Sequence, residues 1–223
     1  MDLLNILTHI LMSLTTWQRI AVMAVPMLLA ITVHEAAHGY VARHFGDMTA
    51  ARLGRISLNP LKHIDPIGTL LIPCISMLSG FFFGWAKPVP VDFMKLRHPK
   101  RDMLWVAAAG PASNLVMAIL WGLVMNYAFA LNPKAALPLA LMGAAGIFTN
   151  VGLMVLNLIP LPPLDGGRIA VSLLPPNLSN KFAQIERFGF VIIIALAFTG
   201  VLGKAISPLI DFLSQLISRI FMY

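Results

Sequence analysis

Charged residues and cysteines are both scarce in this sequence. Only 11% of its 223 residues are charged and 58% are hydrophobic, which lies outside the usual composition of soluble domains. Cys74 is the single cysteine, so it cannot form an intramolecular disulfide or a multi-cysteine metal site. No Lys or Arg precedes Arg19, so the basic start of a cleavable signal peptide is lacking. These shortages indicate a chain that lies mostly in lipid.

Long apolar runs are the most prominent feature that is present. Several reach the roughly 20 residues that a membrane-spanning helix needs. They predict spans over 17–44, 103–131, 137–159 and 185–201. Polar stripes at helical spacing near both ends predict amphipathic helices, which lie in the membrane interface or pack against neighbouring spans. We therefore expect an α-helical polytopic membrane protein with about 4–6 membrane helices, forming one domain over 1–223 with its core at 17–168.

The net charge of +7 does not indicate a nucleic-acid partner, because the basic residues lie in short segments between apolar runs. Two basic clusters follow the first and second runs; they comprise Arg43, Arg52, Arg55 and Lys62, and Lys87, Lys95, Arg97, Lys100 and Arg101. The positive-inside rule favours both at the cytoplasmic face of a bacterial inner membrane. This requires the segment 66–84 to re-enter, or to span while the following chain loops back.

Two segments between the spans, 51–59 and 85–92, have the alternation and β-branched residues of short strands. They predict a small membrane-associated β element, with extended loops as the alternative. Pro88 and Pro90 would leave one edge of the second strand without amide hydrogens, as at the edge of a sheet. We expect this strand to accept an unwound substrate segment by strand addition.

The sequence HEAAH at residues 34–38 carries the clearest chemistry. His34 and His38 are four residues apart on a helix, so both imidazoles project from one face and can share a zinc ion. Glu35 on the adjoining flank can act as a general base. A satisfied polar cluster between helices is the alternative. However, ionisable groups within an apolar helix cost about 2–3 kcal/mol each and persist mainly where a function or a partner uses them.

A catalytic zinc usually keeps three protein ligands, so a third residue is needed. Asp165 is the only acid between Asp102 and Glu186, and it follows the predicted span 137–159. Its position before glycine suits either a metal ligand or a cap of the following turn. The rival ligands His44 and His63 lie beside Arg or Lys and are expected at the surface.

Three motifs occur in order along the chain, namely HEAAHGY from residue 34, GPASN at 110–114 and NLIPLPPLDGGR at 157–168. On these motifs the chain resembles the site-2 protease family of intramembrane zinc metallopeptidases, peptidase family M50. The resemblance covers about residues 31–168. Many relatives carry a PDZ domain between spans, and no segment here is long enough for one, so the chain resembles a compact form.

The resemblance implies one zinc per chain, with His34, His38 and Asp165 as ligands and Glu35 as the general base. It implies that Asn157 lies near the zinc and helps to hold the substrate carbonyl or stabilise the oxyanion. An interhelical hydrogen bond is the alternative for Asn157, and Asn114 is interpreted as structural. The implied reaction is hydrolysis of peptide bonds in transmembrane or membrane-associated protein substrates, with the lipid bilayer as the surroundings.

Two other functions use the same residues. A membrane metal transporter or metal-binding protein would need Glu35 only for affinity, whereas a protease would lose cleavage without it while still binding zinc. A membrane protease of the prenyl-protein-processing kind would complete its zinc site with a distant glutamate, and Glu186 is the only other glutamate. The LDGG sequence disfavours this last alternative.

Overall fold

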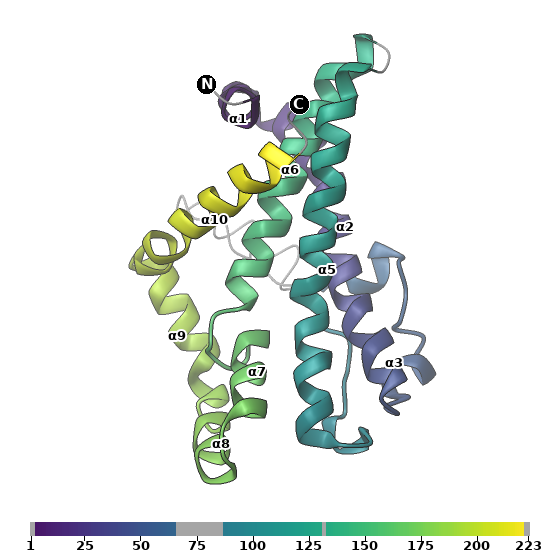
Figure 1. The fold of residues 1–223 in the computed structure, drawn as a ribbon, viewed down its shortest axis with the longest axis vertical. Helices are drawn as coiled ribbons and strands as arrows, with labels where there is room; N and C mark the ends of the chain where they lie inside the picture. Colours follow the sequence, from purple (N-terminus) through teal and green to yellow (C-terminus); the bar gives the residue numbers. More distant parts are fainter. Residues whose placement is uncertain (1–2, 66–86, 131–132, 221–223) are drawn as a thin grey trace. The chain divides into compact units, whose positions relative to one another are not determined.

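The computed structural model describes residues 3–65, 87–130 and 133–220, and every regular element within these ranges is helical (Figure 1). The chain divides into two compact units. Unit 1 comprises Met1–Ala30, Pro111–Asn157 and Lys204–Tyr223, and unit 2 comprises Ile31–Gly110 and Leu158–Gly203. The division falls inside α2, α5 and the first turn of α10, so each of these helices contributes to both units.

The elements follow in the order α1 (Leu3–Ser13), α2 (Thr16–His44), α3 (Thr49–Arg52), η1 (Pro60–His63), η3 (Phe93–Lys95), α5 (Pro99–Tyr127), η4 (Ala128–Ala130), α6 (Pro133–Asn157), α7 (Asp165–Leu173), α8 (Pro176–Ala183), α9 (Glu186–Phe198) and α10 (Val201–Ile220).

Four helical segments among the described residues are long and apolar enough to cross a membrane; they are Thr16–His44, Pro99–Tyr127, Ala135–Asn157 and Val201–Ile220. The first three correspond to the predicted spans at 17–44, 103–131 and 137–159. Each contains an internal proline, which membrane helices tolerate because neighbouring groups satisfy the freed carbonyls. These helices are those of an integral membrane protein. The expected re-entrant segment 66–84, which includes Cys74, lies outside the described residues.

The prediction of a span over 185–201 is wrong. Its apolar part forms α9, which has only 13 residues and ends at Phe198. At about 1.5 Å per residue such a helix is shorter than the roughly 30 Å hydrocarbon core of a bilayer. Gly200 ends the helix with φ of 72°, a conformation that favours glycine, and its amide donates to the carbonyl of Ala197. α10 begins at the next residue.

The predicted β element is also wrong, because the described residues contain no strand. Residues 51–59 continue from α3 into turns, and Lys87–Asp92 is extended chain without a ladder. An alternation of polar and apolar residues indicates only which way the side chains point, and not whether the backbone pairs with another strand. The peptide groups of 87–92 are bonded instead to side chains and to isolated carbonyls, as described below. Trp85 lies outside the described residues.

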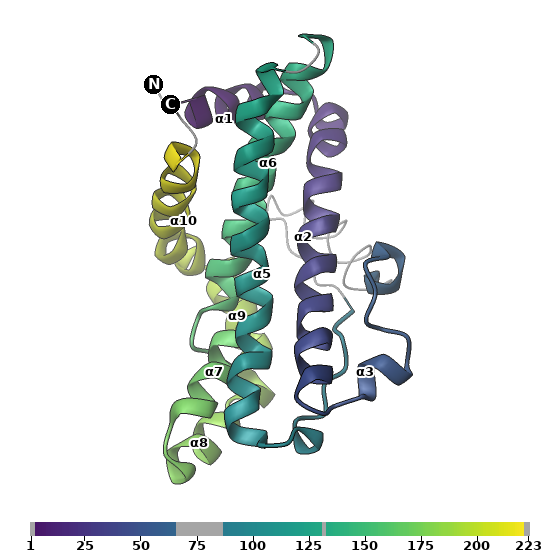
Figure 2. The same cartoon turned by 45° about the vertical axis from the view of Figure 1, so that its right-hand side comes forward.

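The terminal helices both pack into unit 1. α1 lies against α6 (Figure 2). It buries Leu4, Leu7 and Leu11, while His9 of its polar stripe is exposed. In α10, Ser214 and Ser218 of the polar stripe are buried, whereas Ser207 and Asp211 are exposed. The second half of the α10 stripe therefore packs within the protein, and the placement of this helix in the membrane interface stays a prediction. The exposed residues of α10 include the apolar Leu209, Phe212 and Leu216.

Small residues and paired amides join the helices of unit 1. A Cβ added at Gly146 of α6 would lie 2.2 Å from Cγ of Trp121 on α5, so the close approach requires glycine. Asn114 is fully buried, and its Nδ2 donates to Asn150 Oδ1 at 2.9 Å and to the Ala30 carbonyl at 3.3 Å. The structural interpretation of Asn114 is confirmed, since its amide links three helices.

Candidate metal centre

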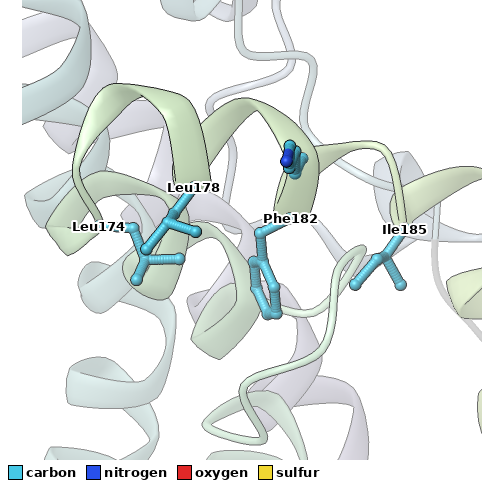
Figure 3. Close-up of a pocket in the computed structure, with 5 residues that line it drawn as sticks. Leu174, Leu178, Phe182 and Ile185 are labelled. Atoms are coloured by element: carbon cyan, nitrogen blue, oxygen red, sulfur yellow. The ribbon is translucent and has the colours of Figure 1, made fainter.

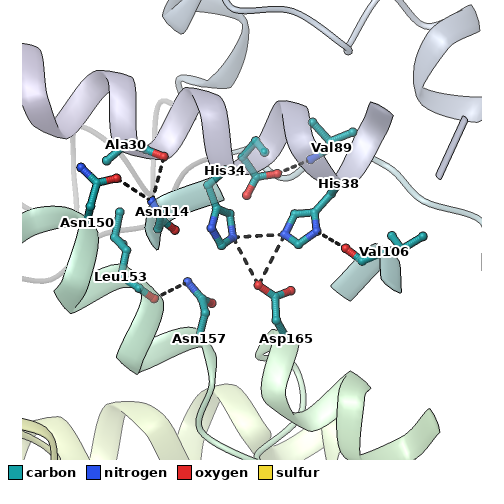
Figure 4. A network of polar contacts seen from close by, with 11 residues as sticks. Ala30, His34, His38, Val89, Val106, Asn114, Asn150, Leu153, Asn157 and Asp165 are labelled. Atoms are coloured by element: carbon teal, nitrogen blue, oxygen red, sulfur yellow. Dashed lines mark hydrogen bonds and ion pairs between the residues drawn. The ribbon is translucent and has the colours of Figure 1, made fainter. Parts of the chain in front are cut away.

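Three side chains of unit 2 converge beside the C-terminal half of α2. His34 and His38 face one another with their Nε2 atoms 3.1 Å apart. Oδ2 of Asp165, the first residue of α7, lies 3.3 Å from His34 Nε2 and 3.4 Å from His38 Nε2 (Figure 4). Within the described residues this is the one group of at least three His, Cys, Asp or Glu side chains that could hold a metal ion. The structure therefore brings together the three residues predicted as ligands.

The spacing of the three ligand atoms fits zinc. Ligand atoms at about 2.1 Å from a tetrahedral zinc ion lie about 3.4 Å from one another. The observed separations are 3.1, 3.3 and 3.4 Å. Asp165 Oδ2 is also buried, and apart from the two imidazoles it has no hydrogen-bond partner among the described residues. Two imidazole nitrogens and one carboxylate oxygen are the donor set of many catalytic zinc sites, which leave a fourth position open.

A backbone carbonyl fixes the orientation of His38. Its Nδ1 lies 2.7 Å from the carbonyl oxygen of Val106 on α5. A carbonyl can only accept, so Nδ1 carries the proton and donates it. In the neutral ring Nε2 then keeps its lone pair, which faces the cluster. Such a partner orients a ligand histidine and increases its basicity. Sequence reasoning missed Val106, because a carbonyl is common to every residue type.

Gly110 lets the two histidines approach α5. A Cβ built at this position would lie 2.4 Å from His38 Nε2 and 2.5 Å from His34 Cε1. No side chain fits there without displacing the imidazoles. Gly110 is one helical turn after Val106, so the same face of α5 supplies both the carbonyl and the space. The two histidines therefore approach α5 at the first residue of the GPASN motif.

The loop before α7 holds Asp165 by direct backbone packing. A Cβ at Gly166 would lie 2.3 Å from the Leu158 carbonyl oxygen, and one at Gly167 would lie 2.2 Å from the Pro162 nitrogen. The two glycines therefore allow the loop to fold against the first turn of the helix. The residue preceding the helix is Leu164, with no side-chain cap, and Asp165 is already helical. The capping role proposed as an alternative for Asp165 is not observed.

The histidines keep Asp165 ionised. Burial by itself would raise the pKa of its carboxyl group, but the hydrogen bonds and charges of His34 and His38 outweigh burial and lower the pKa to about 2. A deprotonated carboxylate is the form that binds a metal ion. The ionised side chain is thus available as a ligand at neutral pH.

The carboxylate of Glu35 is held by the chain within the second basic cluster, between Lys87 and Lys95. Glu35 Oε2 accepts a hydrogen bond of 2.7 Å from the amide of Val89. Val89 lies between Pro88 and Pro90, so its amide is the only N–H group in that triplet. This contact was not predicted, since the sequence gives no signal that one particular peptide group binds a distant carboxylate.

Several other peptide groups of 87–92 are also engaged within unit 2. The Lys87 amide donates to the His63 carbonyl at 2.9 Å, and the Asp92 amide donates to Asp47 Oδ2 at 2.7 Å. Arg55 Nη2 donates to the carbonyls of Lys87 and Pro88. The addition of a substrate strand to this segment stays a prediction.

The rival ligands lie outside the cluster. His44 is exposed, as expected, and its ring packs edge-on against Phe45. His63 is only 2% exposed and its Nε2 lies 2.8 Å from the Ser57 carbonyl, so the prediction of a surface position is wrong. Glu186 forms an ion pair of 3.1 Å with Arg168. The glutamate that the prenyl-protein-processing alternative would need as a zinc ligand is therefore paired with Arg168 instead.

Asn157 is the last residue of α6 and belongs to unit 1. Its Nδ2 donates to the Leu153 carbonyl of the same helix at 3.0 Å (Figure 4). This bond is local, so the interhelical hydrogen bond considered as the alternative for Asn157 is not found among the described residues. Its place near the zinc stays a prediction.

An apolar pocket lies where α7, α8 and α9 meet in unit 2. Figure 3 shows Leu174, Leu178, Phe182 and Ile185 on its lining, and Lys181 completes the set. The pocket shares no residue with the metal cluster and offers neither a carboxylate nor an imidazole. It does not compete with the cluster as the candidate catalytic site.

Known proteins show similarity over most of the chain. The family model described as Peptidase family M50 matches residues 134–199. "Putative zinc metalloprotease YwhC" of Bacillus subtilis (strain 168) is 38% identical over 207 residues, which cover 89% of this chain and 92% of that protein. "Putative zinc metalloprotease Rip2" of Mycolicibacterium smegmatis is 34% identical over 179 residues, covering 79% of this chain and 66% of that protein. No solved structure shows significant similarity.

Proposed function

Because the chain belongs to peptidase family M50 and is a zinc metalloprotease, we propose that it cuts transmembrane or membrane-associated protein substrates in or beside the bilayer. His34, His38 and Asp165 bind one zinc ion in this proposal, and Glu35 is the general base. The four apolar helices support a membrane substrate, since they leave the chain mainly in lipid.

Each residue has a distinct task in the reaction. When bound, zinc supplies Lewis-acid activation of water and of the peptide carbonyl. Glu35 takes a proton from the attacking water and later delivers it to the leaving nitrogen. The amide of Val89 keeps the Glu35 carboxylate in one orientation during both transfers. Asn157 holds the substrate carbonyl, a role that rests on the family resemblance.

The observation that carries the proposal is the convergence of His34, His38 and Asp165, with Glu35 next to the first ligand and tied to Val89. A site made only to bind metal has no need of an acidic side chain held apart from the ligands. Glu35 is therefore the residue that distinguishes a protease from a metal transporter.

Replacing Glu35 with glutamine tests the proposal. Gln has nearly the same shape and can still accept from Val89, so Glu35→Gln should fold and retain zinc. Cleavage should fall by about 10² to 10⁴, because Gln cannot take the proton. The assay uses the purified chain in detergent, a fusion substrate with a transmembrane segment, and zinc measured on the same samples.

A matched control is Asp211→Asn, which changes an exposed acid on α10 of unit 1. It should retain both zinc and cleavage. Cleavage by Glu35→Gln at the wild-type rate would exclude the base, and loss of zinc together with activity would favour the transporter.

We also propose that both basic clusters face the cytoplasm, as the positive-inside rule favours. Contacts within unit 2 support a common side: Arg55 donates to Lys87 and Pro88, and the Arg97 amide donates to the Phe45 carbonyl at 2.9 Å. Leu58 and Met94 are both exposed. Cysteines at these positions, in a Cys74→Ser background, should react from the cytoplasmic side only, and labelling from opposite sides would contradict the arrangement.

A further inference from the structure

Arg168 connects three parts of unit 2. It lies three residues after Asp165 on α7, in the next helical turn. Its Nη2 is 3.1 Å from Glu186 Oε1 at the start of α9. Its guanidinium carbon lies 4.8 Å from the ring centroid of Phe93 in η3, which is the distance of a cation–π contact.

Phe93 belongs to the same stretch of chain that holds Glu35. The amides of Val89 and Asp92, close before it, donate to Glu35 and to the buried Asp47. The ring of Phe93 packs with the small apolar cluster of Ala42, Leu96 and Val106. Ala42 is one turn beyond His38 on α2, and the Val106 carbonyl is the partner of His38. Phe93 is thus fixed relative to both histidines and the base.

Asp165 is carried by a different part of the chain from the other three residues. His34, Glu35 and His38 share α2, and Asp165 reaches them only through the placement of α7. Arg168 lies on α7; its guanidinium group contacts the ring of Phe93 and forms an ion pair with Glu186. Lys100 at the start of α5 donates to the Leu174 carbonyl and holds the far end of α7.

We propose that Arg168 is a positioning residue, which holds Asp165 in place opposite the two histidines by clamping α7 between Phe93 and Glu186. This inference rests on the proposed function, because it assumes that Asp165 is a zinc ligand. Arg168 itself touches neither zinc nor substrate.

The clamp predicts a defined loss of zinc affinity. Groups that orient metal ligands typically contribute about 10- to 100-fold in affinity or activity. Arg168→Gln and Phe93→Leu should therefore each weaken zinc binding by about 10-fold or more and lower kcat, with little change in KM. Zinc affinity is measured by competition with a chelator on the purified full chain in detergent, and cleavage is measured with the fusion substrate.

Two further variants separate positioning from a general structural effect. Phe93→Tyr keeps the aromatic face and should restore nearly wild-type zinc affinity and kcat. The double variant Phe93→Leu/Arg168→Gln should be no weaker than Arg168→Gln alone, because both changes remove the same contact.

Arg187→Gln is the matched control. The Arg187 guanidinium carbon lies 4.7 Å from the ring centroid of Phe188, a similar contact on α9. This variant removes the same charge without removing the contact to Phe93. It should leave zinc affinity and kcat unchanged.

Wild-type zinc affinity and kcat in Arg168→Gln would overturn the inference, as would equal losses in Arg187→Gln. If Arg168→Gln fails to fold, Phe93→Leu and Phe93→Tyr decide the same question. The proposed function fails independently: an active Glu35→Gln would contradict it whatever Arg168 does, whereas an inactive Glu35→Gln with a wild-type Arg168→Gln would contradict only the clamp.

Discussion

The two units of the chain bury different kinds of residue. The large apolar cluster lies entirely in unit 1 and includes Leu4, Leu7, Met125, Ile147 and Val151. The buried ionisable side chains found among the described residues all lie in unit 2; they are His34, Asp47, His63 and Asp102. Within the part of unit 2 that the structure describes, the apolar cluster has Ala42, Leu96 and Val106 as its buried members.

This difference indicates which interactions hold each unit together. In unit 1, helices associate through close packing and a few amide hydrogen bonds, as is usual in membranes. In unit 2, buried charges would be costly unless each found a partner, and the partners are peptide groups and other side chains. Apart from Asn157, for which we propose a contact with substrate, substitutions in unit 1 should therefore change stability, whereas substitutions in unit 2 should change metal binding and catalysis.

The largest expected effect is loss of zinc on removal of a ligand in unit 2. Asp165→Ala and His38→Ala should each weaken zinc binding by more than about 100-fold, since two remaining ligands form a poor chelate. Zinc content of the purified variants gives the answer. Asn150→Ala in unit 1 should retain its zinc. Undiminished zinc in Asp165→Ala would exclude it as a ligand.

A pair of glycines compares the units directly. Gly110→Ala places a methyl group 2.4 Å from His38 Nε2, and Gly146→Ala places one 2.2 Å from Trp121 Cγ. Gly110→Ala should weaken zinc binding by about 10- to 100-fold. Gly146→Ala should cost about 1–3 kcal/mol of stability through overpacking, while folded protein keeps its zinc. Thermal unfolding in detergent and zinc titration measure the two effects, and similar zinc losses in both variants would remove the distinction.

A smaller effect is expected for Asp47, which is buried and accepts hydrogen bonds from the amides of Thr49 and Asp92. Asp47→Asn turns one acceptor into a donor that faces an amide, at a cost of about 1.5–3 kcal/mol. Because Asp92 anchors the segment that holds Glu35, kcat should fall while zinc is retained. Asp211→Asn, which alters an exposed carboxylate on α10, serves as the control and should leave kcat nearly unchanged. Equal kcat values for wild type and Asp47→Asn would show that this anchor is dispensable.

The smallest effect is expected in the amide pair of unit 1. Asn114→Ala removes the hydrogen bonds to Asn150 and the Ala30 carbonyl. Interhelical hydrogen bonds in membranes contribute about 0.6 kcal/mol on average, with a maximum near 1.7 kcal/mol. Thermal unfolding should show this modest loss, with zinc content and cleavage unchanged. A loss of zinc here would mean that the two units are not functionally separate.

Sequence patterns were sufficient for three of the spans and for the metal cluster. Apolar runs located α2, α5 and α6 because their length is set by the bilayer. The spacing of His34 and His38 placed both on one helical face, and Asp165 stood out as a lone acid after a span. These inferences depend on side-chain type and spacing, which the sequence states directly.

The errors arose where backbone groups decide the structure. Alternation in 85–92 resembled a strand, yet its amides bind Glu35, Asp47 and the His63 carbonyl. His63 follows Lys62 and was expected at the surface, but its partner is the Ser57 carbonyl. The span over 185–201 was predicted from hydropathy alone, but Gly200 ends α9 within this run. Carbonyls and amides are the same in every residue, so the sequence does not show which of them are used.

The hydrogen bond from Val89 to Glu35 has a consequence for how this enzyme can vary. Its donor is a peptide N–H, which every residue except proline carries. Position 89 can thus exchange its side chain during evolution without releasing the carboxylate, provided that the new group fits beside Gly39, where Val89 now packs closely. Val89→Pro is the one substitution that removes the donor outright, and neither flanking proline can replace it. Directed evolution at this position should therefore recover many residues among active variants, but not proline.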